Sequence, residues 1–209
     1  MDQENSTTQV KTATLDVFKH RAAFAISNFG NPFILLIFLT AYACFHFMEL
    51  HEAIKVLTIF LGVSFVPTLL FIVINVRRGK FSNYDVSTKA QRPYFYIFAI
   101  TLIGIVTITL FLMPAVDKFV RLGSLAAFTM LLGSFLINIR LKSSLHTCFS
   151  VYVAIAFAAM NPLAGLALAV LAFLMGWSRI SLKRHTLSEV LTGACLGSLV
   201  GSVFYWLVK

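Results

Sequence analysis

The sequence predicts an all-α fold, a polytopic membrane helical bundle with six to seven transmembrane helices. Hydrophobic residues make up 59% of the 209 residues and charged residues only 12%, whereas a soluble domain carries about 25% charged residues. The apolar residues gather in runs close to the roughly 17–25 residues that a helix needs to cross a bilayer. Backbone groups in lipid must pair within their own segment, so these runs predict helices rather than strands.

Residues 1–31 form a polar and amphipathic lead-in, which lacks the basic start of a secretory signal peptide. The stretch from Leu15 to Phe29 fits a short interfacial helix, with an apolar face of Leu15, Phe18, Ala22 and Ile26 opposite Lys19 and Arg21. A solvated lead-in fits the same composition. Residues 32–209 contain neither a linker nor an internal repeat, so we expect a single transmembrane helical domain.

Seven apolar runs of this domain are candidate spans: Pro32–Met48, Ala53–Val76, Pro93–Met113, Leu122–Ile139, Ser144–Met160, Pro162–Ser178 and Leu187–Val208. The fifth and sixth are short and adjoin at Asn161-Pro162, which predicts a tight hairpin, with a re-entrant pair as the alternative. Pro32, Pro93 and Pro162 fall near helix starts, where a missing N–H costs least. Pro67 lies inside the second run and predicts a kink.

The net charge of +9 is distributed unevenly between the two sets of loops. Of the 17 basic residues, 13 lie on the side of the N-terminus: Lys11, Lys19, Arg21, Arg77, Arg78, Lys80, Lys89, Arg92, Arg140, Lys142, Arg179, Lys183 and Arg184. Four lie on the opposite side: Lys55, Lys118, Arg121 and Lys209. The positive-inside rule then places the N-terminus in the cytoplasm of a multi-pass protein of the cell (inner) membrane.

Basic loops also bind anionic lipid headgroups, so membrane lipids are expected partners. Nucleic acid is not expected, because no soluble basic surface remains outside the spans. Cys44, Cys148 and Cys195 lie in or beside apolar runs and are interpreted as small hydrophobic residues. No Cys-x-x-Cys or His-rich cluster is present, and the sequence predicts neither a metal nor a cofactor. The oligomeric state stays open.

The most informative pattern is Ser178-Arg179, five residues, His185, three residues and Glu189. Residues four apart share a helix face, so the Glu189 carboxylate can accept a hydrogen bond from one ring nitrogen of His185. That bond leaves the other nitrogen free as a nucleophile or base. Arg179 can present a planar fork to phosphate oxygens.

Two further groups of residues precede this pattern. Arg92-Pro93 begins the third apolar run, and Lys89 lies three residues earlier. Ser144 and His146 lie at the start of the fifth run, where a helix N-terminus favours an anion. Ser144 either caps that helix or bonds a phosphate oxygen, and His146 can act as a general acid.

Pairs of spans separate the three groups, and two crossings return the chain to the side it left. We therefore expect Arg92, His146, Arg179 and His185 to meet at one membrane face. Two histidines, two arginines and one carboxylate gathered there indicate chemistry on a phosphate.

At these residues the chain resembles the type 2 phosphatidic acid phosphatases, a membrane branch of the phosphatase–vanadium haloperoxidase superfamily. The family's motifs are Lys, six residues, Arg-Pro; Pro-Ser-Gly-His; and Ser-Arg, five residues, His, three residues, Asp. The third motif matches with Glu189 in place of Asp, whereas Asp85 occupies the Lys position of the first and Leu145 the Gly position of the second. The resemblance runs from Asp85 to the C-terminus and leaves the first two spans outside it.

The resemblance implies a metal-independent phosphatase acting on a lipid phosphate or pyrophosphate. His185 is then the nucleophile that forms a phosphohistidine, Glu189 orients it, and His146 is the acid and later the base. Arg92 and Arg179, with Lys89, stabilise charge on the phosphoryl oxygens. Bacterial relatives usually face the periplasm and eukaryotic ones the lumen, in disagreement with the charge count. The sequence does not name the lipid.

Two other classes of function stay open at this stage. One is a catalytically silent relative that binds a phospholipid headgroup or acts as a membrane scaffold, which the departures at Asp85 and Leu145 favour. The other is a small transporter or haem-binding helical protein that uses membrane histidines, for which paired histidines without an arginine cluster are expected.

Overall fold

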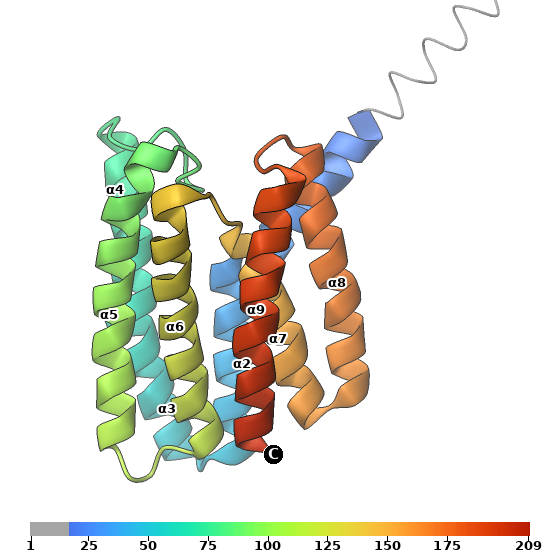
Figure 1. The fold of residues 1–209 in the computed structure, drawn as a ribbon. Coiled ribbons are helices and arrows are strands. Elements are labelled where there is room, and N and C mark those ends of the chain that lie inside the picture. The colour runs from blue at the N-terminus through green and yellow to red at the C-terminus, as the bar shows by residue number, and fades with distance from the viewer. Residues whose placement is uncertain (1–16) are drawn as a thin grey trace, which may run out of the picture.

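The computed structural model describes residues 17–209 (Figure 1), and every regular element within that range is a helix. The elements in chain order are a first helix Val17–Phe29, α2 (Pro32–Phe47), α3 (Leu50–Ile59), the π-helical η1 (Phe60–Phe65), α4 (Val66–Arg77), the 3₁₀ turn η2 (Lys89–Gln91), α5 (Arg92–Leu112), α6 (Lys118–Arg140), α7 (Leu145–Met160), α8 (Pro162–Ser181) and α9 (Leu187–Val208). The all-α prediction is confirmed for these residues.

Five helical segments are long and apolar enough to cross a membrane: Leu50–Arg77, Lys89–Leu112, Lys118–Arg140, Pro162–Ser181 and Leu187–Val208. A sixth arises if Val17–Phe29 and α2, which meet at a bend of 43°, form one span. The predicted fifth span, α7, is apolar but has only 16 residues. The bundle is therefore compatible with a multi-pass membrane protein.

Proline and asparagine define the starts of several helices. Pro32 and Pro162 each occupy the first turn of their helix, as predicted, and each follows an asparagine. The side chain of Asn31 accepts the backbone N–H of Phe33 at 2.9 Å, and Asn161 caps α8 in the same way. These caps satisfy N–H groups that the helix leaves free. Asn161 also ends α7, so α7 and α8 form the predicted tight hairpin (Figure 1).

Pro67 alters the second predicted span without breaking it. It occupies the first turn of α4, directly after the π-helical segment η1. A proline cannot donate the backbone hydrogen bond of its position, and a wider π turn accommodates the freed carbonyl groups. The structure thus shows a local change in helix type within the continuous segment Leu50–Arg77, while the kink itself stays a prediction.

The lead-in is described only from Val17, and residues 1–16 of it lie outside the described residues. Phe18, on the apolar face predicted for contact with the membrane, is 70% exposed and does not pack against the rest of the bundle. Ala23 and Ser27 are buried instead, four residues apart on one side of the helix. This side faces α8, since Ser27 contacts Arg179 there.

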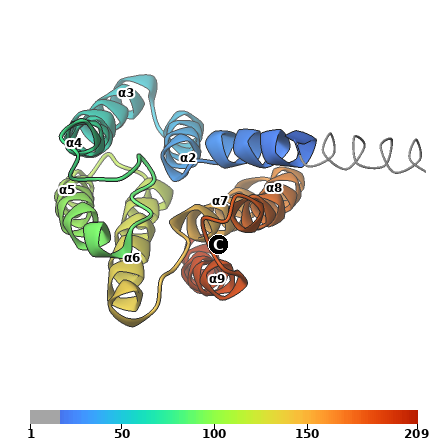
Figure 2. The same ribbon diagram turned by 90° about the horizontal axis from the view of Figure 1, so that it is seen from above.

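The short helix α7 lies at the centre of the second half of the bundle, beside α2, α6, α8 and α9 (Figure 2). Ten of its 16 residues are buried: His146, Thr147, Cys148, Phe149, Ser150, Tyr152, Val153, Ala154, Ala156 and Phe157. A helix buried on most sides is apolar almost all round, which explains its composition.

Glycines allow α9 to approach α7 closely. A Cβ added at Gly193 would lie 2.4 Å from the carbonyl oxygen of Ser144, and one at Gly197 would lie 2.2 Å from that of Cys148. Only residues without a side chain fit at such backbone contacts, which are typical of membrane helix pairs. The contact brings the start of α9 beside the start of α7, where the N–H of Ser144 donates to the carbonyl of Glu189 at 3.0 Å.

Three connections gather at one end of the bundle, together with the end of the first helix (Figure 1). They are residues 78–88, 141–144 and 182–186. Each is separated from the next by two antiparallel helices, as the sequence predicted. The residues of the three sequence motifs lie in or beside these connections.

The α7–α9 contact can be tested at Gly197. We expect Gly197→Ala to lower the free energy of unfolding by about 1–3 kcal/mol, because the added methyl group forces two backbones apart. Gly62→Ala is the matched control, since a Cβ there meets no atom within 4 Å. Thermal unfolding of both variants in detergent is the measurement. Equal melting temperatures for the two would contradict the contact.

Candidate active site

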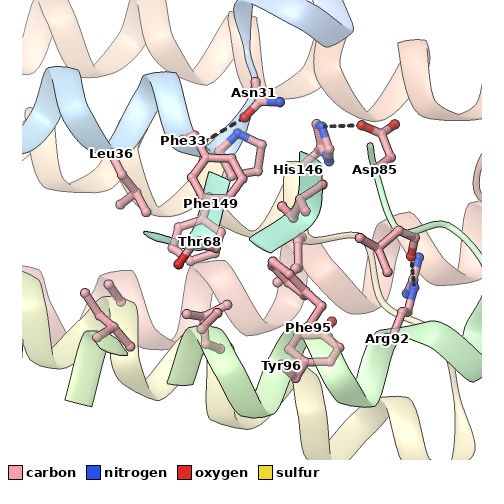
Figure 3. A pocket seen from close by; sticks show the side chains of 18 of the residues that line it. Asn31, Phe33, Leu36, Thr68, Asp85, Arg92, Phe95, Tyr96, His146 and Phe149 are labelled. Atoms are coloured by element: carbon pink, nitrogen blue, oxygen red, sulfur yellow. Dashed lines mark hydrogen bonds and ion pairs between the residues drawn. The ribbon is translucent and has the colours of Figure 1, made fainter. Parts of the chain in front are cut away.

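A pocket of about 100 Å³ is lined by residues in or beside the three connections and by side chains farther along the helices, such as Ile103 and Ala127 (Figure 3). Six of its polar lining residues lie in or beside the three connections: Asp85, Arg92, Ser143, His146, Arg179 and His185. The rest of its wall is largely apolar and comes from α2, η1, α4, α5, α6 and α7. The structure therefore brings together the two arginines and two histidines that the sequence predicted to meet.

His185 and Glu189 form the hydrogen bond that their spacing predicted. The distance from His185 Nδ1 to Glu189 Oε2 is 2.7 Å. A carboxylate only accepts, so Nδ1 carries the proton and Nε2 keeps a free lone pair. Thr186 caps α9 by accepting the N–H of Glu189. The sequence Thr-x-x-Glu resembles a capping box, but here the glutamate turns to the histidine instead.

A tight turn after α8 directs His185 back toward Arg179. Lys183 adopts a left-handed φ of 54° just after the helix. The carbonyl of Arg179 accepts the N–H of Arg184 at 3.1 Å, and that of Ile180 accepts the N–H of Lys183 at 2.9 Å. This pair of bonds is a Schellman motif, which usually has glycine in the left-handed position. The N–H of His185 also reaches the Arg179 carbonyl, at 3.2 Å.

Arg179 lies in the last turn of α8 and is only 1% exposed. Its Nη1 donates to Ser27 Oγ at 2.8 Å, and both Nη atoms donate to Asp85 Oδ2 at 3.1 Å. The guanidinium thus already has anionic and polar partners from two distant parts of the chain. The sequence predicted an arginine in a polar connection, whereas the structure buries it inside the bundle.

Asp85 is a second carboxylate in the site, and it stands where the first family motif has a lysine. Its Oδ2 accepts from Arg179 and also from Arg184 Nη1. Its Oδ1 lies 3.9 Å from His146 Nε2 (Figure 3). Burial raises the pKa of the Asp85 carboxyl, but the His146 ring and the two guanidiniums outweigh it and hold that pKa below its ordinary value.

The backbone next to Asp85 is strained. Val86 has a φ of 45° and is buried. A β-branched residue in the left-handed region is a conformational outlier that costs about 1–3 kcal/mol. Contacts on both sides hold it there, because Asp85 bonds Arg179 and the Val86 carbonyl accepts Arg92 Nε at 3.2 Å.

Arg92 begins α5 and lines the pocket, and its side chain also forms hydrogen bonds to residues in other connections. Its Nη1 donates to the carbonyl of Ser143 at 3.1 Å and to Asn138 Oδ1 at 3.4 Å. The guanidinium therefore links residues 78–88, the end of α6 and residues 141–144. It retains its positive charge beside the pocket, where it can still act on an anion through space.

His146 is in the first turn of α7, and its buried Nε2 has no hydrogen-bond partner among residues 17–209. The nearby Ser143 Oγ is likewise buried without a partner in the described chain. Unpaired buried polar atoms are rare and costly, and they commonly mark a position that a ligand or water occupies. Both residues line the pocket.

Two predicted phosphate-binding residues lie apart from the pocket wall. Lys89 is exposed, and its Nζ donates to the carbonyl of Arg140 at 3.2 Å. Ser144 caps α7, with its Oγ accepting the N–H of Thr147 at 3.4 Å. Of the two roles that the sequence allowed for Ser144, the structure shows the cap.

Sequence reasoning missed Ser27 and Arg184, both of which contact the charged cluster. Ser27 precedes the region of resemblance, and Arg184 is one of several basic residues near a span end. Neither had a sequence signal that separated it from its neighbours.

The arrangement holds a free histidine nitrogen, a second histidine and two arginines around one pocket, and Arg184 is paired with Asp85 beside them. Such a set of groups suits an anion. Among the described residues, no group of three His, Cys, Asp or Glu side chains is placed to hold a metal ion. Comparison of the chain with protein-family profiles, with curated proteins and with solved structures finds no match in any of the three.

The state of His185 makes stability depend on pH. Burial, together with repulsion from Arg179, lowers its pKa from 6.5 to about 4, although Glu189 acts in the opposite direction. The folded protein therefore keeps this ring neutral where the unfolded chain binds a proton. The contribution of His185 to the free energy of unfolding is complete above pH about 6.5 and is lost as the pH falls toward about 4. The loss amounts to roughly 3 kcal/mol.

We expect the melting temperature, measured between pH 4 and 8, to fall toward the acid side. The His185→Gln variant should show a smaller slope of melting temperature against pH than the wild type. His51, which is exposed at the other end of the bundle, supplies the matched control. His51→Gln should leave the slope as in the wild type. An unchanged slope in His185→Gln would show that His185 is not held neutral.

Proposed function

We propose that this protein is an integral membrane phosphatase that hydrolyses a lipid phosphate or pyrophosphate through a phosphohistidine intermediate. The observation that carries the proposal is the His185–Glu189 pair at 2.7 Å, which leaves Nε2 free in the pocket that Arg92, His146 and Arg179 also line. A nucleophile, a second proton-transferring group and a set of cations are the parts that phosphoryl transfer requires.

In the first step, His185 Nε2 attacks the phosphorus atom while the bond from phosphorus to the lipid oxygen breaks. His146 gives a proton to that leaving oxygen, so the lipid departs as a neutral alcohol. The Glu189 carboxylate stabilises the positive charge that develops on the His185 ring and holds the ring in one tautomer. Attacking and leaving groups need to lie roughly in line, which requires the two histidines on opposite sides of the phosphorus.

In the second step, His146 takes a proton from water, and the water oxygen attacks the phosphorus of the phosphohistidine. The phosphorus–nitrogen bond breaks, inorganic phosphate forms, and His185 returns to its starting state. Arg92, Arg179 and Arg184 lower the energy of both transition states, because their charges lie where negative charge builds up on the phosphoryl oxygens.

The apolar wall of the pocket supports a lipid as the source of the phosphate. Leu36, Phe60, Phe95 and Ile103 contribute to it from three helical elements, α2, η1 and α5. A lipid chain in contact with these side chains would place its phosphate at the polar end. The end of the bundle that carries the site is the one that the count of basic residues assigns to the cytoplasm.

A second candidate is a catalytically silent membrane protein that binds phospholipid headgroups or acts as a scaffold. The contacts of Asp85 favour it, since this carboxylate takes up donors of Arg179 and Arg184 that a phosphate would need. Release of inorganic phosphate from a panel of lipid phosphates by the purified protein separates the two candidates.

The nucleophile is tested by His185→Ala. We expect phosphate release to fall roughly 10³-fold or more, because the substitution removes the nitrogen that forms the covalent intermediate. His51→Ala is the control, with an exposed ring remote from the site. Size-exclusion and thermal unfolding profiles show whether the variant is folded. Near-normal turnover by folded His185→Ala would refute the mechanism.

Dependence on metal ions is tested by chelation. Asp85 is held by arginines and Glu189 by His185, so neither carboxylate is free to coordinate Mg²⁺. We expect phosphate release to survive EDTA and to be inhibited by orthovanadate, which adopts the five-coordinate geometry of the transferring phosphoryl group. Activity that appears only when Mg²⁺ is added would contradict this expectation.

A further inference from the structure

The Asp85 carboxylate lies among the groups that would bind a phosphoryl oxygen. One of its oxygens accepts from Arg179, at 3.1 Å to each Nη atom, and from Arg184. The other points toward His146 Nε2, 3.9 Å away. Two oxygens of a carboxylate thus face two guanidiniums and one imidazole, which is the set of partners expected for two oxygens of a phosphate.

We propose that Asp85 occupies the phosphoryl position of the resting site and that the phosphoryl group of a ligand must displace it. This displacement lowers the affinity for every phosphate. Only phosphates with a long apolar chain then bind tightly enough to occupy the site. This inference rests on the proposed function for its substrate class. It assigns a role to the residue at which the chain departs most from the family it resembles.

Displacement follows from charge. A phosphate dianion and the Asp85 carboxylate would repel each other across a few ångströms in a partly dry site, while both compete for the same guanidinium protons. Binding of one therefore requires the other to leave. The free energy needed to displace Asp85 therefore weakens the binding of every ligand by the same amount.

The structure provides a way for Asp85 to leave. Asp85 belongs to residues 78–88, which lie outside the long helices, and its side chain is 17% exposed. The next residue, Val86, is held at a φ of 45°. Moving this segment relieves unfavourable backbone geometry, which offsets part of the lost ion pair.

An apolar chain supplies the affinity that the phosphate alone lacks. The polar site and the apolar side chains of Leu36, Phe60 and Phe95 line the same pocket. Each methylene group buried there increases affinity roughly fourfold. Inorganic phosphate and short phosphate esters gain nothing from this wall, so Asp85 keeps them out and also favours release of the phosphate product.

The test is calorimetric titration of the purified protein in detergent with orthovanadate, butyl phosphate and dodecyl phosphate. We expect Asp85→Asn to bind all three about tenfold or more tightly than the wild type, by a similar factor, because the same competitor is removed in each case. Glu49→Gln is the matched control: it removes one negative charge at the other end of the bundle and should leave the three affinities unchanged.

Unchanged or weaker binding by folded Asp85→Asn would overturn the inference, as would a gain confined to one ligand. If Asp85→Asn does not fold, Asp85→Ser takes its place in the titrations, with the same gain in affinity expected. The wild type supplies a further test of the threshold. It should bind orthovanadate about a hundredfold or more weakly than dodecyl phosphate. Similar wild-type affinities for these two ligands would overturn the threshold.

The proposed function and this inference fail separately. If Asp85→Asn gains affinity but neither protein releases phosphate from any lipid, the phosphatase proposal is wrong and the role of Asp85 stands. If the wild type hydrolyses lipid phosphates while Asp85→Asn shows no gain in affinity, the role of Asp85 is wrong and the phosphatase proposal stands.

Discussion

The buried guanidinium of Arg179 is the constraint on which the rest of this structure depends. A positive charge at the end of an apolar helix is costly unless it finds acceptors. Arg179 finds them in Ser27 and Asp85, which lie 152 and 94 residues away in the sequence. Its carbonyl accepts N–H groups from Arg184 and His185 as well. One residue thereby joins the first helix, the α4–α5 connection and the turn before α9, and the polar end of the pocket forms around it.

Close helix packing determines where the chemistry of this site can occur. Gly193 lets α9 approach the start of α7, so that Ser144 bonds directly to the backbone of Glu189. His146 and His185 therefore line the same pocket, although they are 39 positions apart in the sequence. The positions of the reactive side chains thus follow from glycine contacts inside the bundle as much as from the motifs themselves.

Asp85 connects stability with function. Its ion pairs with Arg179 and Arg184 compensate buried positive charge, which stabilises the folded chain. The same pairs occupy the donors that an anionic ligand needs. Asp85 therefore stabilises the folded chain and opposes the binding of an anion. Such a trade-off between stability and function is common at functional sites. The strained φ of Val86 shows that this arrangement is held by its contacts rather than by local preference.

The sequence by itself determined the helices, their approximate ends and the convergence of Arg92, His146, Arg179 and His185, because apolar run length, proline position and an even number of crossings are local or countable properties. The His185–Glu189 bond was equally predictable, since it depends only on helical spacing. Only the tertiary structure decided that Asp85 pairs with Arg179 and Arg184 and that Ser27 joins them. It also decided that Ser144 acts as a cap and that Lys89 stays at the surface. These outcomes depend on which of several similar polar side chains in neighbouring connections points inward, and long-range packing settles that choice without leaving a periodic signal in the sequence.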